Sequence, residues 1–283
     1  MKKILFPTDF SDAANRAFIY ALNLTAHVGG QITTVHVYQN PEIPSTMLSN
    51  TLNDFMEQFE IDTFKNYQDN IPPLNKIAEE YGFADLDIRH VLEKGPVVKT
   101  ILEVAARDEV DMIIMGTTGA SGFKELVIGS IAGEVLEKAP CPVLAVPTQA
   151  VFDGKIDNIA FTTTFSEEEK LGFEKVLGIA EPLKAKVHCV NVDLAHTEFY
   201  LQRMKKMEEN YPNRPNLAFK SLDGTNIKEE LTRYMEENSI DILAMITHKR
   251  NFFQELFHFS KTKMMSYHTK TPILALPSSM VAV

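Results

Sequence analysis

The sequence predicts an α/β fold made of two tandem doubly wound domains, each a mainly parallel five-stranded sheet with helices on both faces. Three observations predict it. The length of 283 residues suits two domains of about 140 residues each. The chain repeats itself along most of its length. Short apolar, β-branched runs alternate with helical stretches, which is typical of parallel strands buried on both faces.

The internal repeat divides the chain into two halves. The aligned segments are 4–11 with 159–166, 35–37 with 190–192, and 115–147 with 245–277. We expect domains at residues 1–148 and 155–283, because the segment Thr148–Lys155 between them loses periodicity and reads as a short linker. Two similar folds on so short a tether should pack as a pseudo-twofold pair that imitates a homodimer. Whether two whole chains pair further is left open by the sequence.

Five strands with intervening helices are expected in the first half. The apolar runs that read as strands are 4–6, 32–38, 86–92, 112–115 and 143–146. Ser11 is the expected N-cap of the first helix, whose apolar residues recur at helical spacing. The residues expected to be buried by this helix are Ala14, Ala17, Phe18, Ala21 and Leu24.

The second half keeps this scaffold with two differences. Its first helix opens with Ser166 and, three residues later, Glu169, which is the pattern of a capping box. The first half has a long connection at 39–83, punctuated by the pair Pro72-Pro73, which the second half replaces with one helix near 198–210. The stripe of this helix expected to be buried consists of Tyr200, Leu201, Met204 and Met207.

The expected strand order in each half is 3-2-1-4-5. The order then reverses between strands one and four, and ligands of doubly wound folds bind in that crevice, at the carboxyl ends of the strands. The loops that follow Phe6 and Met115 flank the crevice in the first half. We therefore look for the site's chemistry in these two loops.

A glycine-rich loop follows the fourth strand. It reads Gly116-Thr117-Thr118-Gly119, then nine residues, then Gly129-Ser130 at the start of a helix. Glycines let backbone amides approach a phosphate closely, and Ser130 would cap the helix, whose positive end also favours an anion. Across the crevice, Asp9 can accept hydrogen bonds from ribose hydroxyls or from a base amino group. Loop glycines alone are more typical of structural turns, but this placement indicates a phosphate site.

This spacing is neither a Walker loop nor the Gly-x-Gly-x-x-Gly dinucleotide fingerprint. It resembles the nucleotide signature of the universal stress protein family, in its tandem form, and the resemblance covers essentially the whole chain. It implies a Rossmann-like, adenine nucleotide alpha hydrolase-like fold, a cytoplasmic stress-response role, and ATP, or AMP or ADP, as ligand, with or without Mg²⁺. It also implies dimerisation through the closing strand, here within one chain. The site residues that it implies are Pro7, Thr8, Asp9, Val37, Met115, Gly116, Gly119, Gly129, Ser130 and Ile131.

The second half departs from this pattern. Ile246 and Lys249 replace the first two glycines, Phe259 the third, and Thr164 the aspartate, which leaves only Ser260. Phosphate binding in the same manner is therefore not expected there. The aromatic residues that crowd the loop are Phe252, Phe253, Phe257 and Phe259. Core filling is the favoured interpretation; the alternatives are that they cover the neighbouring half or form an apolar pocket for another ligand.

Composition excludes several other classes of function. The formal net charge of −10 opposes binding to nucleic acid, and no apolar stretch approaches a membrane span, so neither partner is expected. Cys141 and Cys189 read as small buried hydrophobes of a protein in a reducing cytoplasm. The grouping of His188, Asp193 and His196 is a weak metal signal, because the first two should point to opposite faces of a strand.

Three functions remain open from the sequence. The favoured one is a regulatory protein that binds an adenine nucleotide in its first half. The others are an interaction scaffold, in which the glycine loop is a relic, and a slow ATP-hydrolysing switch. No carboxylate pair, activated nucleophile or cluster of metal ligands adjoins the loop, so dedicated catalysis is not indicated, and at most weak ATP hydrolysis is expected.

Overall fold

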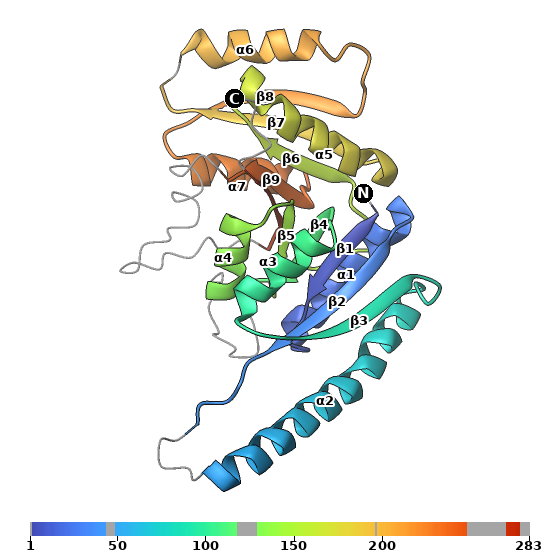
Figure 1. Cartoon of the computed structure of the whole chain (residues 1–283). Coiled ribbons are helices and arrows are strands. Elements are labelled where there is room, and N and C mark those ends of the chain that lie inside the picture. The colour runs from blue at the N-terminus through green and yellow to red at the C-terminus, as the bar shows by residue number, and fades with distance from the viewer. Residues whose placement is uncertain (1, 44–48, 118–128, 196, 248–269, 278–283) are drawn as a thin grey trace.

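The computed structural model describes residues 2–43, 49–117, 129–195, 197–247 and 270–277. The strands of the first half are β1 (Lys3–Pro7), β2 (Gln31–Tyr38), β3 (Asp87–Lys94), β4 (Met112–Gly116) and β5 (Val143–Val146). Those of the second half are β6 (Asn158–Thr162), β7 (Lys186–Asp193), β8 (Leu217–Asp223), β9 (Ile242–Ile246) and β10 (Ile273–Leu276). Together they form one ten-stranded sheet (Figure 1).

The sheet confirms the predicted order in both halves. Its strands run β3-β2-β1-β4-β5-β10-β9-β6-β7-β8, so each half has the order 3-2-1-4-5. Pairing is parallel within each half, and β5 and β10 pair antiparallel where the halves meet. In that pairing Leu144 lies opposite Leu274, its equivalent in the repeat. The pseudo-twofold axis therefore passes between these two strands, as expected for an internal dimer.

Helices cover both faces of the sheet. The first half has α1 (Asp12–Val28), α2 (Ser49–Glu80), α3 (Val97–Arg107) and α4 (Ser130–Lys138). The second has a short 3-10 turn η1 (Glu167–Glu169), then α5 (Lys170–Leu183), α6 (Glu198–Glu209) and α7 (Ile227–Glu237). One large core joins α1, α5 and part of α2 to the sheet, and a second large core joins α3, α4 and part of α7 to it. A third, small core packs α7 on β7 and β8. The two large cores contain residues of both halves, so the halves are packed together through their interiors.

The start of α1 agrees with the sequence. Ser11 is its N-cap, and its hydroxyl oxygen accepts a hydrogen bond from the Ala14 amide at 3.2 Å. The helix ends at Gly29, whose φ of 67° lies in the left-handed region that glycine adopts without strain. All five apolar residues predicted to face the core are buried.

The predicted capping box in the second half is wrong. The Ser166 side chain makes no capping hydrogen bond. The buried carboxylate of Glu169 instead accepts hydrogen bonds from the Thr163 hydroxyl at 2.6 Å and the Thr164 amide at 2.8 Å. A carboxylate that is removed from water requires such donors, and both are supplied by the end of β6. One turn of 3-10 helix therefore precedes α5.

The pair Pro72-Pro73 does not interrupt the chain, because both prolines lie inside α2. They remove the amide donors that would bond the carbonyls of Gln68 and Asp69. Both of these residues are exposed, so water can take the place of the missing donors. Tyr67 and Leu74, on the opposite face, are buried and hold the helix against the core.

Helix α6 forms where the sequence predicts it, but its apolar stripe is not buried. No α6 residue is fully buried, and Leu201 is 42% exposed. Met204 and Met207 are half-buried against the core. The reason is position: α6 packs on β8, the last strand of the sheet, so that only part of its surface finds a partner.

The segment between β5 and β6 is attached to α1. The Arg16 guanidinium donates to the Thr148 carbonyl at 2.6 Å, and the ring of Phe152 packs edge-on against Tyr20 with 4.9 Å between ring centroids. The predicted linker is therefore held on the surface of the first half.

Candidate functional site

The carboxyl end of β1 forms a tightly bonded turn. The Thr8 amide donates to the Val35 carbonyl at 2.9 Å, and the Thr8 carbonyl accepts from Nδ1 of His36 at 2.8 Å. The Thr8 hydroxyl accepts from the Phe10 amide at 3.0 Å, and Phe10 has a φ of 60°, which few non-glycine residues adopt. These bonds fix the backbone on both sides of position 9.

Asp9 therefore has a defined place at the mouth of the crevice. Its side chain is exposed, and its Oδ1 atom accepts from the Ser11 amide at 3.1 Å. Pro7, the last residue of β1, is buried and lies beside Val35 of β2. The turn thus presents a carboxylate to solvent at the end of a buried strand, as the sequence predicts.

Val37 and Met115 lie on the two strands that flank β1. Because Pro7 pairs with Val35, β2 continues past the end of β1 and carries half-buried Val37 to the edge of the crevice. Met115 is buried in β4, and both side chains pack in the core that includes α3 and α4. The backbone of β2 next to Val37 thus extends beyond the carboxyl end of β1, whose other neighbour is β4.

Gly116 lies directly beneath the first turn of α1. A Cβ atom added there would be 3.2 Å from the Ala13 carbonyl oxygen and 3.5 Å from the Ala14 amide nitrogen. Contacts that close to backbone atoms leave little room for a side chain. The first glycine of the loop therefore has a packing reason of its own, in addition to any contact with a ligand.

The loop after β4 closes on itself at its base. The Thr117 amide donates to the Val146 carbonyl of β5 at 3.0 Å, and the Gly129 amide donates to the Thr117 carbonyl at 2.6 Å. Thr117 is buried. The start and the end of the glycine loop are thus held together next to the end of β4. Gly119 lies outside the described residues.

Helix α4 begins at this closure. Gly129 is its N-cap, so Ser130 is the first residue of the helix and not, as the sequence suggests, its cap. Glycine has no side chain that can accept a bond from the first amides, and no side-chain capping bond is present at this end. Ser130 and Ile131 are exposed. The positive end of α4 and its first amides therefore have no side-chain acceptor at the cap position.

The same crevice of the second half is built differently. Ile246 takes the place of Gly116, and its side chain fills the space beneath α5. Room for it is made by Gly172, where an added Cβ would lie 2.8 Å from Cδ1 of Ile246. Sequence reasoning missed this exchange, although Gly172 aligns with Ala17 of the first half and was a visible signal. The substituted loop residues 249, 252, 253, 257, 259 and 260 lie outside the described residues.

The turn after β6 has the same form as the turn after β1, but a buried carboxylate of the chain lies against it. The Asn191 amide group donates to the Thr163 carbonyl at 2.8 Å, as His36 does to Thr8. Thr164 replaces Asp9, and its amide is bonded to the buried Glu169 carboxylate. A negative group of the chain itself thus lies against this turn, which opposes a second anion there.

The weak metal signal in β7 has a structural explanation. Nδ1 of His188 lies 2.9 Å from the Tyr234 hydroxyl, and burial lowers the pKa of this histidine to about 4. Asp193 accepts the amides of Ala195 and Thr197 at 2.9 and 2.8 Å. Within the described residues, no group of three His, Cys, Asp or Glu side chains is placed to hold a metal ion. His196 lies outside them.

Both cysteines are buried and free. Burial raises the pKa of the Cys141 thiol to about 11, and burial also raises the pKa of Cys189. Such thiols stay protonated near neutral pH and are poor nucleophiles. Their expected role as small apolar core residues is therefore consistent with the packing. None of the helices in the described ranges is long and apolar enough to cross a membrane.

Comparison with known proteins gives consistent matches. A model of the universal stress protein family matches residues 1–147. Two universal stress proteins of Methanocaldococcus jannaschii are 29% and 30% identical over 148 and 158 residues; each alignment covers 51% of this chain and 81% or 94% of the relative. The crystal structure of a universal stress protein from Archaeoglobus fulgidus aligns over 98% of both chains, with a TM-score of 0.75 and 18% identity, and has the same overall fold.

Proposed function

This chain belongs to the universal stress protein family, and from that premise we propose that its first half binds an adenine nucleotide, ATP or AMP or ADP, as a cytoplasmic regulatory protein of the stress response. The observation that carries the proposal is the closed base of the glycine loop at the start of α4. There the Thr117 carbonyl bonds the Gly129 amide, and the helix begins without a side-chain cap. Amides and a positive helix end at this position are suited to a phosphate group.

Two further predicted features, at Asp9 and Val37, support the proposal. Asp9 offers a carboxylate at the mouth of the crevice, where ribose hydroxyls can donate to it. The backbone of β2 near Val37 borders the same crevice and suits the edge of an adenine ring. Mg²⁺ would be held by the phosphates together with water, since the described residues contain no cluster of metal ligands.

The crevice is connected to the contact between the halves. Thr117, at the base of the loop, donates to Val146 at the end of β5, and β5 pairs with β10 of the second half. Occupancy of the loop thus acts on the strand that joins the two halves. We infer that the nucleotide regulates a partner surface through this contact, with one nucleotide for each chain.

The proposal is tested by nucleotide content and calorimetry. Purified protein is denatured and any released nucleotide is identified by chromatography; the emptied protein is then titrated with ATP and AMP, with and without Mg²⁺. One site per chain is expected. Gly129→Val should weaken binding at least about tenfold, because a branched side chain obstructs the phosphate and leaves the helix start less accessible. Gly178→Val is the matched control, since nothing lies within 4 Å of an added Cβ there.

One observation favours the scaffold alternative. Gly116 is required by the close approach of α1 even without a ligand, so that glycine alone does not argue for nucleotide binding. If neither nucleotide binds, or if Gly129→Val binds as the wild-type protein does, the loop is a structural relic. A slow ATPase would instead show turnover that falls in the Asp9→Asn and Gly129→Val variants.

A further inference from the structure

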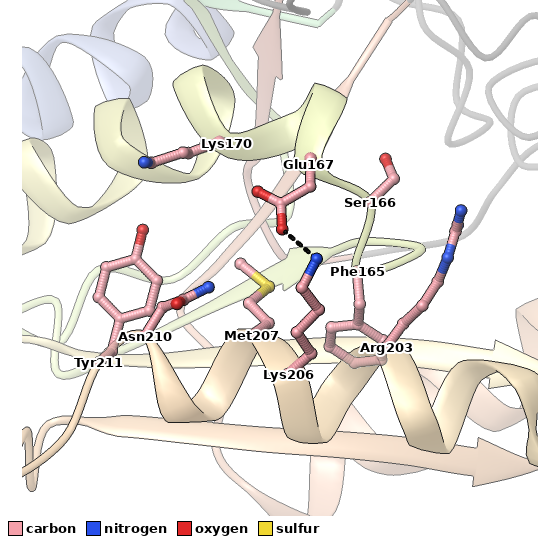
Figure 2. A pocket seen from close by; sticks show the side chains of 9 residues that line it. All are labelled: Phe165, Ser166, Glu167, Lys170, Arg203, Lys206, Met207, Asn210 and Tyr211. Carbon is pink, nitrogen blue, oxygen red and sulfur yellow. Dashed lines mark ion pairs between the residues drawn. The ribbon is translucent and has the colours of Figure 1, made fainter.

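A cavity of about 150 Å³ lies in the second half, between the start of α5 and helix α6 (Figure 2). It opens on the side of the sheet that carries α5 and α6. Of the residues aligned with the nucleotide loop, the structure describes Ile246 and Thr247 at the end of β9, and neither lines the cavity. The cavity is therefore a separate feature of the second half, beyond the proposed nucleotide site.

The rim of the cavity is cationic in a chain that is anionic. Lys170 comes from α5, and Arg203 and Lys206 come from α6; Glu167 is the acidic residue among the lining side chains. The cavity thus carries a formal charge of about +2 at neutral pH, whereas the whole chain carries −10. Such a local excess of positive charge attracts anions.

Among the described residues, Lys206 is the one of these three cations that is paired with a carboxylate. Nζ of Lys206 lies 3.1 Å from Oε1 of Glu167, in a pair that is exposed and hence weak. Among the residues that the structure describes, Lys170 and Arg203 form no ion pair. The Arg203 guanidinium lies over the ring of Phe199, 4.5 Å from its centroid, which restricts the orientation of this cation. In Figure 2, Arg203 and Lys206 project from the same helix, and Glu167 faces Lys206 across the cavity.

Part of the cavity wall is apolar and aromatic, beside the polar Ser166 and Asn210. Phe165 is buried, and Met207 and Tyr211 are packed against the core cluster. The Tyr211 ring stands edge-on against Phe173, with 5.1 Å between centroids, so it is held in place. A cavity of this size accepts a molecule about as large as benzene. An apolar group therefore fits inside while a charged group stays at the rim.

The first half provides an internal comparison. At the positions of Glu167 and Lys170 it has Asp12 and Asn15, so this part of the rim carries no cation there. Its Phe10 ring lies 6.3 Å from the ring of buried Tyr67 on the long helix α2. The second half has exchanged that helix for the shorter α6, which brings Arg203 and Lys206. The cationic rim is thus specific to the half whose nucleotide loop is degenerate.

We propose that this cavity binds a small organic anion, in which one phosphate or carboxylate group is attached to an apolar body of benzene size. The anionic group lies at the rim, where it competes with Glu167 for Lys206 and is attracted by Lys170 and Arg203. The apolar body lies against Phe165, Met207 and Tyr211. No covalent step is involved.

The test uses the full chain and phenyl phosphate as the probe. Protein saturated with ATP, so that the proposed nucleotide site is filled, is titrated with phenyl phosphate by calorimetry and by two-dimensional NMR. We expect one site at millimolar or tighter affinity, with shifts at Met207 and Tyr211 and with weaker binding at high salt. Phenol and inorganic phosphate are the two comparison ligands, and each should bind less tightly than phenyl phosphate. No binding at about 10 mM phenyl phosphate, which corresponds to an affinity weaker than roughly 3 kcal/mol, would overturn the proposal.

Variants that remove a positive or a negative charge from the rim distinguish binding in this cavity from a general attraction of anions to the protein surface. Arg203→Gln and Lys170→Gln should each weaken phenyl phosphate binding about fivefold, and Glu167→Gln, which frees Lys206, should strengthen it about fivefold. Lys205→Gln is the matched control, because Lys205 is an exposed neighbour on α6 that does not line the cavity. Equal effects of Lys205→Gln and Arg203→Gln, or weaker binding in Glu167→Gln, would contradict the assignment. If ATP fails to bind while phenyl phosphate does, the nucleotide proposal fails and this one stands.

Discussion

Substitution of Gly172 by alanine tests whether Ile246 fills the crevice of the second half. An added Cβ at position 172 would lie 2.8 Å from Cδ1 and 3.1 Å from Cγ1 of Ile246, and 3.6 Å from Cδ1 of Leu276. Ile246 is 4% exposed, so its side chain has little space into which it can move. Overpacking of this kind costs about 1–3 kcal/mol. The change from glycine to alanine inside a helix raises the free energy of unfolding by up to about 1 kcal/mol, which offsets part of this cost.

The two terms predict a net loss of about 1 kcal/mol in the free energy of unfolding for Gly172→Ala. Gly178→Ala, in the same helix, has open space around the added Cβ. It should therefore raise stability by up to about 1 kcal/mol. In an Ile246→Ala background the obstacle is removed, and Gly172→Ala should become stabilising by about 1 kcal/mol.

The assay is urea unfolding followed by far-UV circular dichroism and tyrosine fluorescence, whose transitions must coincide for a two-state treatment. The decisive result is the change of sign between the two backgrounds. If Gly172→Ala were as stabilising as Gly178→Ala in the otherwise unchanged protein, Ile246 would not occupy that space. The account of how Ile246 packs beneath α5 would then be refuted.

Two further predictions concern buried polar groups of the second half. Glu169→Ala leaves the Thr163 hydroxyl and the Thr164 amide without their acceptor, and it should lower the free energy of unfolding by about 3 kcal/mol. The exposed neighbour Glu168 is the control: Glu168→Ala should change stability by less than about 0.5 kcal/mol in the same urea measurement. His188 has a folded-state pKa of about 4, lowered from 6.5 by burial and by the nearby Lys186. Its neutral form is the one that folding favours, so its contribution to stability is fully present above pH 6.5 and is lost as the pH falls towards 4. NMR titration of the His188 ring checks the pKa, and urea midpoints at several pH values should fall less steeply in His188→Gln than in the wild-type protein.

The fold was predictable because each half repeats the other. Two aligned copies of the same strand pattern give the strand order twice, and the pairing of Leu144 with Leu274 follows once the closing strands are placed together. The errors lie where a local pattern competes with tertiary contacts. Ser166 and Glu169 match a capping box, yet the carboxylate is bound by the end of β6. Pro72 and Pro73 were expected to punctuate a long connection, yet both lie inside α2, which the core holds in place.

The candidate site was predictable in its position and less so in its detail. Asp9, Gly116 and Gly129 lie where the switch point of a doubly wound sheet requires. The packing of Gly116 against α1 depends on a distance between segments far apart in the chain, which spacing alone does not contain. The same holds for the cavity beside α6, because Arg203 and Lys170 come together only when α6 packs near the start of α5.

The antiparallel pairing of β5 with β10 has a consequence for how the molecule behaves on dilution. In a dimer of separate subunits, such a contact weakens as the protein becomes scarce, by mass action. Here both strands belong to one chain, and the short segment at Thr148–Lys155 keeps their effective concentration in about the millimolar range. The paired state is thus independent of expression level. Two sites that would be identical in a symmetric assembly were thus free to diverge in sequence, and every molecule contains one of each kind.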